Sequence, residues 1–148
     1  MSTVTYSNPD VVQALEREFV PVQVDLETSS KLADQYQAIW TPSLNVIDAR
    51  GRKVYGIEGW LPPEHFRAML EAARGQVLLR GKQFAPAADV FQGVIDRFAG
   101  TPYAAEARYY RGVARYLDAH QVDALKDEWG RLTQAYPASE WAVRADIF

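Results

Sequence analysis

Apolar residues in the first half of the chain follow helical spacing and then strand spacing. Val11, Leu15 and Phe19 recur every four residues, which predicts one apolar face of a helix. Asn8 as N-cap and Pro9 at the first helical position mark where this helix begins. Residues 20–26 then alternate apolar and polar side chains, which predicts a strand.

The next stretch predicts a helix and a hairpin. Ser29 or Ser30 caps a helix that is expected to bury Leu32 and Tyr36. The apolar run over 44–47 predicts a strand, and the residues Asp48–Gly51 are typical of a turn. Residues 53–58 are therefore expected to pair back as the second strand of a hairpin.

A last helix of this half begins at Pro62-Pro63. Its predicted core face has helical spacing and comprises Phe66, Met69, Leu70 and Ala73. Gly75 is expected to kink or break the helix.

From residue 76 onward the pattern is helical throughout and repeats at an offset of 38 residues. Large apolar residues and alanines recur in the same order, as in stacked helical hairpins. The matched pairs are Phe91 with Trp129, Val94 with Leu132, Phe98 with Tyr136, Tyr103 with Trp141, Ala104 with Ala142, and Ala107 with Ala145. The segments 81–88, 110–112 and 136–141 resemble degenerate tetratricopeptide repeats, although the usual period of that family is shorter.

From about Val4 to Arg74 the chain resembles bacterial thioredoxin-like proteins. The segments that carry the resemblance are 19–25, Trp40-Thr-Pro42, the hairpin turn 48–51 and Gly59-Trp-Leu-Pro-Pro63. The resemblance implies an α/β thioredoxin-like domain over 1–74, and a tetratricopeptide-like helical segment follows over 75–148. It also implies a cis peptide bond before Pro42, and a Thr41 backbone that is presented to an extended peptide.

One strand of the thioredoxin fold is missing from the pattern. In that family the strand is central, and it lies between the strands that correspond to 20–26 and 44–48. Three alternatives stay open: residues 2–6 fill the gap, a second copy supplies the strand in a homodimer formed by strand exchange, or the natural protein begins further upstream. Residues 2–6 are polar for a strand that would be buried on both faces.

Two sets of candidate binding residues follow from these patterns. Trp40, Thr41, Pro42, Gly59 and Trp60 are expected to form an apolar ledge that binds a protein or an extended peptide. A second, weaker set comprises Arg108, Arg111 and Arg115, which share one helix face and could hold acidic groups of a partner. The alternative for these arginines is a solvated face that is paired with Glu106 and Asp118.

Composition excludes several classes of chemistry. The chain of 148 residues contains no cysteine, which removes disulfides, thiol nucleophiles and the Cys-x-x-Cys pair of thioredoxin. The two histidines are far apart, and no catalytic motif is present, so no metal, cofactor or catalytic residue is expected. A net charge of −3 argues against nucleic acid. Without a membrane-spanning run or a signal segment, a cytoplasmic location is expected.

Two functions are compatible with these features. The first is a redox-inactive thioredoxin-like binding module with a helical docking tail. The second is a thiol–disulfide oxidoreductase whose Cys-x-x-Cys lies upstream of residue 1.

Overall fold

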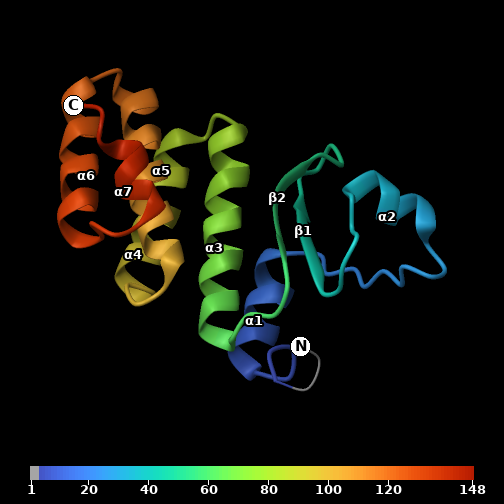
Figure 1. The fold of residues 1–148 in the computed structure, drawn as a ribbon. Coiled ribbons are helices and arrows are strands. Elements are labelled where there is room, and N and C mark those ends of the chain that lie inside the picture. Colours follow the sequence, from blue (N-terminus) through green and yellow to red (C-terminus); the bar gives the residue numbers. More distant parts are fainter. Residues whose placement is uncertain (1–3) are drawn as a thin grey trace. The chain divides into compact units, whose positions relative to one another are not determined.

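The computed structural model describes residues 4–148. The chain divides into two compact units, Met1–Arg67 and Ala68–Phe148, and the boundary falls within one helix. Figure 1 shows the order of the elements along the chain. The first unit contains α1 (Pro9–Glu18), α2 (Ser30–Tyr36), β1 (Ser43–Ile47), β2 (Lys53–Glu58) and the first turn of α3 (Pro63–Arg80). The second contains the rest of α3, then α4 (Phe84–Arg97), α5 (Pro102–Ala119), α6 (Val122–Ala135) and α7 (Glu140–Ala145).

Helix α1 begins as the sequence predicts. The Asn8 side-chain oxygen accepts hydrogen bonds from the backbone N–H groups of Asp10 (3.0 Å) and Val11 (3.3 Å), and Pro9 follows the cap. Val11 is completely buried. These bonds satisfy two of the backbone donors that a helix leaves free at its start.

The strand predicted over residues 20–26 does not form. That segment has no regular secondary structure, and Val20, Val22 and Val24 expose 90%, 76% and 38% of their surface. The prediction was wrong because alternation gives a segment only the propensity for a strand, whereas a stable strand also needs a neighbour to pair with its backbone. Of residues 2–6, the first two lie outside the described residues, and residues 4–6 belong to a turn.

The predicted hairpin is present as a two-stranded antiparallel sheet. Ser43 lies opposite Glu58, Leu44 opposite Ile57, and the register shifts after Val46. Helix α2 begins after Ser29, which makes no side-chain capping bond. The Tyr36 hydroxyl donates a bond of 3.3 Å to the carbonyl oxygen of Gly51 in the hairpin turn, whereas Leu32 is 41% exposed rather than buried.

Helix α3 buries its predicted face: Phe66, Met69, Leu70 and Ala73 are at most 4% exposed. The expected break at Gly75 is absent, because α3 is continuous from Pro63 to Arg80. Gly75 instead lies against the Phe91 ring of α4, where a Cβ would be 2.7 Å from Cζ. The glycine is therefore explained by close packing between helices and not by a kink.

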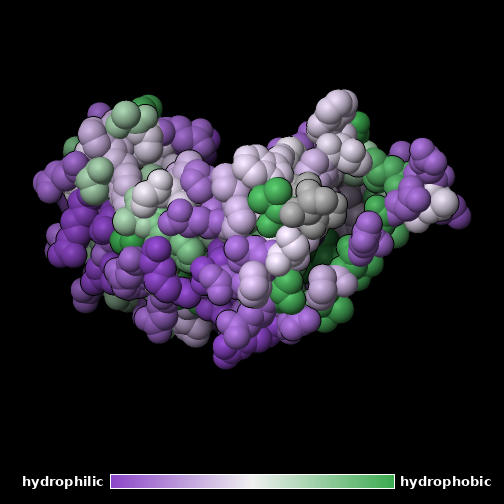
Figure 2. Space-filling view, turned by 90° about the horizontal axis from the view of Figure 1, so that it is seen from below, coloured by the Kyte–Doolittle hydropathy of each residue, from purple (hydrophilic) through white to green (hydrophobic). Residues whose placement is uncertain are grey.

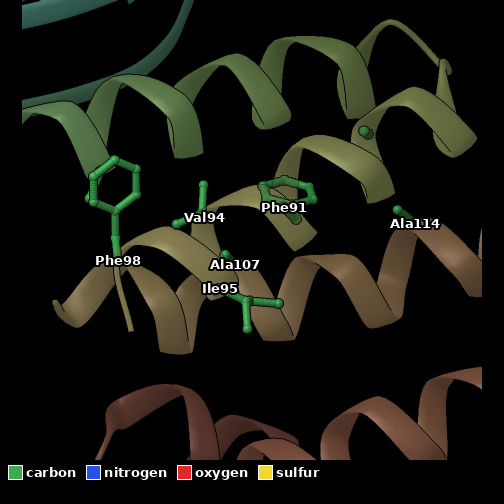
Figure 3. Close-up of a cluster of buried hydrophobic side chains, with 8 residues drawn as sticks. Phe91, Val94, Ile95, Phe98, Ala107 and Ala114 are labelled. Atoms are coloured by element: carbon green, nitrogen blue, oxygen red, sulfur yellow. The ribbon is translucent and has the colours of Figure 1, made fainter. Parts of the chain in front are cut away.

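In the second unit, α4 packs on α5, α5 on α6, and α7 on both α5 and α6. One cluster of buried side chains joins α3, α4 and α5; Figure 3 shows Phe91, Val94 and Ala107 among its members. A second cluster around Trp129 and Leu132 joins α5, α6 and α7. Burial of these apolar surfaces stabilises the helical unit.

The offset of 38 residues reappears in the local geometry of this unit. Lys82 and His120 both adopt the left-handed conformation, with φ of 59° and 54°, in the loops after α3 and α5. The hydroxyls of Thr101 and Ser139 each donate a 2.8 Å bond to a carbonyl oxygen three residues earlier, that of Phe98 and that of Tyr136. The predicted repeat thus corresponds to helical hairpins with equivalent loops, although Ser139 caps its helix through its side chain and Thr101 does not.

Candidate functional site

The loop between α2 and β1 carries three of the predicted binding residues. Helix α2 ends at Gln37, which has a left-handed conformation with φ of 54°. The chain then runs through Trp40 and Thr41, and the Thr41–Pro42 peptide bond is cis, as the resemblance implied. Strand β1 begins directly after it at Ser43.

A backbone hydrogen bond brings this loop to the other two predicted residues. The Gly59 N–H donates to the Pro42 carbonyl oxygen at 2.9 Å. Gly59 has a φ of 98°, a region that L side chains rarely adopt, so a glycine lets the chain turn here after β2. The Thr5 hydroxyl donates a 2.7 Å hydrogen bond to the carbonyl oxygen of Leu61, and this bond joins the N-terminal turn to the segment that follows Trp60.

Large apolar side chains flank this hydrogen bond and face solvent. Trp40 is 68% exposed and Trp60 is 54% exposed. Ile39, which the sequence analysis did not single out, is 86% exposed. Hydrophobic residues, coloured green in Figure 2, are visible on the surface of this unit. We call the surface of Trp40, Thr41, Pro42, Gly59 and Trp60 the tryptophan ledge.

Strand β1, which follows the ledge in the chain, pairs with β2 along one edge and with no other described strand along the opposite edge. In an antiparallel pair of strands, every second pair of opposed residues is hydrogen-bonded. Because Pro42 and Gly59 are such a pair, Ser43 and Asn45 belong to pairs without these bonds, and their backbone N–H and C=O groups point away from β2. Within the described residues the sheet has only the strands β1 and β2, so no further strand covers this edge. An uncovered edge is a template for pairing with another extended chain.

The three arginines of the second candidate set meet at one carboxylate. Arg111 Nη1 and Arg115 Nη1 both donate to Oε1 of Glu128 in α6, the latter at 2.9 Å. Arg108 Nη1 lies 3.6 Å from Oε2. Glu128 is completely buried. Glu128 was not among the residues predicted from the sequence, because nothing in the sequence pattern indicates that α6 turns this residue toward α5.

Among residues 4–148, no group of three or more His, Asp or Glu side chains lies close enough together to hold a metal ion. No helix in that part of the chain is both long and apolar enough to cross a lipid bilayer.

Comparison with protein families agrees with the first half of this description. A model of the thioredoxin-like domain family matches residues 1–74, which is half of the chain, and the protein therefore belongs to that family. No curated protein and no solved structure matches the chain. The chain is thus a thioredoxin-like domain without cysteine, followed by a region of packed helices.

Proposed function

We propose that the thioredoxin-like unit is a redox-inactive module that binds an extended peptide at the tryptophan ledge. The observation that carries this proposal is the exposure of Trp40 and Trp60, at 68% and 54%, beside the Gly59–Pro42 hydrogen bond. Tryptophan and arginine anchor many protein interfaces, and exposed aromatic surface gains most when it is covered. Disulfide exchange requires thiols, which this chain lacks.

The unpaired edge of β1 favours a ligand in an extended conformation over a helical ligand. A peptide that pairs with Ser43 and Asn45 would gain main-chain hydrogen bonds in the manner of an added strand. Successive side chains of a strand point to opposite faces, so alternate side chains of the peptide would contact the indoles of the ledge. The backbone of Thr41 lies directly before this edge and extends the same template.

For the helical unit we propose a tetratricopeptide-like scaffold that docks a protein partner. Two glycine–aromatic contacts support a repeated unit: Gly75 lies against Phe91, and Gly112 lies against Trp129. In both, a glycine on the first helix of a hairpin receives a large ring from the second. Repeats of this kind present surfaces for protein binding and carry no chemistry of their own.

Peptide selection followed by calorimetry tests the ledge. The whole chain is used to select binders from a random-peptide display library, and the selected peptides are titrated against the wild type, Trp40→Ala and Trp60→Ala. Each substitution is expected to weaken binding by about tenfold or more, as for anchor residues of an interface. Tyr116→Ala, which removes an aromatic side chain that is 37% exposed on α5, is the matched control.

Loss of affinity in both tryptophan variants, with binding unchanged in Tyr116→Ala, supports the ledge. Peptides that bind both tryptophan variants as tightly as the wild type would exclude the ledge as the binding site.

A further inference from the structure

We propose that the side chains of Arg108, Arg111 and Arg115 form a binding site for an oxyanion, a carboxylate or a phosphate group. We call these three residues the arginine cluster. They lie on α5 in the helical unit, and the cluster shares no residue with the tryptophan ledge. The proposal rests on charge, on unpaired donors and on exposure.

The charges in the cluster do not balance. Three guanidinium groups surround one carboxylate, that of Glu128, whose side chain is completely buried. Arginine stays protonated in proteins, so the three guanidinium groups and this one carboxylate together carry a net positive charge. Both hydrogen bonds from the arginines go to Oε1 of Glu128, so its single carboxylate does not occupy all the donors of three guanidinium groups.

Three buried polar atoms of the cluster lack a hydrogen-bond partner among the described residues: two arginine donors and the acceptor Oε2 of Glu128. The Nε atoms of Arg108 and Arg111 are buried, and neither has a hydrogen-bond partner in the described part of the chain. The 3.6 Å between Arg108 Nη1 and Glu128 Oε2 is too long for a hydrogen bond. Buried polar atoms are normally bonded, and exceptions point to a water molecule or an ion that completes the site.

The cluster can be reached from solvent at one end. The side chains of Arg108, Arg111 and Arg115 are 17%, 20% and 40% exposed. Glu128 holds at least two of the guanidinium groups by hydrogen bonds, so less side-chain freedom would be lost when an anion binds. Glu128 is therefore a positioning residue, and Arg115 is the residue that an incoming anion meets first.

The ligand chemistry follows from the guanidinium group. Its planar array of N–H donors matches both oxygens of a carboxylate or two oxygens of a phosphate, which lysine cannot reproduce. The two sources are an acidic peptide and a free phosphate ion. The ligand probes below separate them.

Titration calorimetry of the whole chain at low salt tests the site. The probes are a glutamate-rich peptide with a free C-terminus, the same peptide with an amidated C-terminus, and inorganic phosphate. Arg115→Gln is expected to weaken binding by about tenfold, the loss of a charge-assisted hydrogen bond. The matched control is Arg131→Gln, which removes an exposed arginine of α6 and is expected to change affinity by less than about twofold.

A second variant tests geometry against charge. Arg115→Lys keeps the positive charge and loses the two-pronged donor array, so its affinity is expected to lie between those of the wild type and Arg115→Gln. Thermal unfolding of each variant checks that the helical unit stays folded. If Arg115→Gln does not fold, the comparison of the lysine variant with the wild type still decides the question.

Two outcomes would overturn the proposal. One is that neither peptide nor phosphate binds the wild type. The other is that the Arg115 and Arg131 variants lose affinity equally, which would mean nonspecific attraction to charge. Because the tryptophan ledge lies in the other unit, Trp40→Ala is expected to leave anion binding unchanged, so failure of either proposal can be told from failure of the other.

Discussion

Gly75 of α3 and Phe91 of α4 lie so close that a Cβ on the glycine would be 2.7 Å from Cζ and 2.8 Å from Cδ1 of the ring. Phe91 is completely buried and belongs to the cluster that joins α3, α4 and α5 (Figure 3). The ring therefore cannot move away from a new methyl group without displacing its neighbours.

We accordingly predict that Gly75→Ala destabilises the helical unit. Overpacking of a tight core contact costs about 1–3 kcal/mol, and the better helix propensity of alanine offsets up to about 1 kcal/mol of that. The net loss is expected to be about 1–2 kcal/mol in the free energy of unfolding, measured by urea denaturation. Gly130→Ala in α6 is the matched control, because no atom lies within 4 Å of a Cβ there. That control should raise stability slightly, and equal effects of the two substitutions would contradict the packing argument.

A second prediction concerns Asp48 in the hairpin turn. Its Oδ1 accepts from the backbone N–H groups of Arg50 (2.9 Å) and Arg52 (3.0 Å), and its Oδ2 pairs with the Arg52 guanidinium. The Arg52 side-chain hydrogen bond, followed by the Arg52 backbone bond, lowers the pKa of Asp48 from its ordinary value. A lowered pKa means that the contribution of Asp48 to stability is present above the unfolded-state pKa and is lost as pH falls through the folded-state pKa.

NMR titration of the Asp48 carboxyl carbon checks this prediction. The Asp48 pKa is expected below that of an aspartate in a disordered peptide, and Arg52→Gln is expected to raise it. The amide signals of Arg50 and Arg52 should shift over the same pH range. An Asp48 carboxyl that titrates at or above the ordinary value would contradict the hydrogen-bonding arrangement.

The third prediction concerns Tyr103 in α5. Burial, with the nearby Glu106 charge as a smaller cause, raises the pKa of Tyr103 to about 12. The neutral phenol is thus favoured in the folded state. Its contribution to stability is complete below the unfolded-state pKa of about 10 and is lost as pH rises toward 12.

Ultraviolet absorbance and unfolding experiments at alkaline pH test this behaviour. A tyrosine that ionises near pH 12 should be visible in the absorbance titration of the wild type and absent from that of Tyr103→Phe. Stability should fall between about pH 10 and pH 12, and it should fall less steeply in the phenylalanine variant. Identical alkaline titration curves for the two proteins would contradict the prediction.

Local signals in the sequence accounted for much of the fold. The Asn8-Pro9 helix start, the hairpin turn at Asp48–Gly51 and the buried face of α3 depend on neighbouring residues, and the structure has all three. The repeat at 38 residues was also visible in the sequence, because equivalent packed helices need large apolar residues, such as Phe98 and Tyr136, at equivalent positions. The resemblance to thioredoxin-like proteins was likewise correct over residues 1–74.

Other features were decided only by tertiary structure, since they depend on segments far apart in the chain. Residues 20–26 have the alternation of a strand but remain irregular, because pairing needs a neighbouring strand that alternation cannot supply. Gly75 was expected to break its helix because glycine has a low helix propensity, but α3 is continuous there and the glycine lies against the Phe91 ring. The arginines of α5 were recognised as a stripe, whereas their common partner Glu128 was set by the packing of α6 on α5.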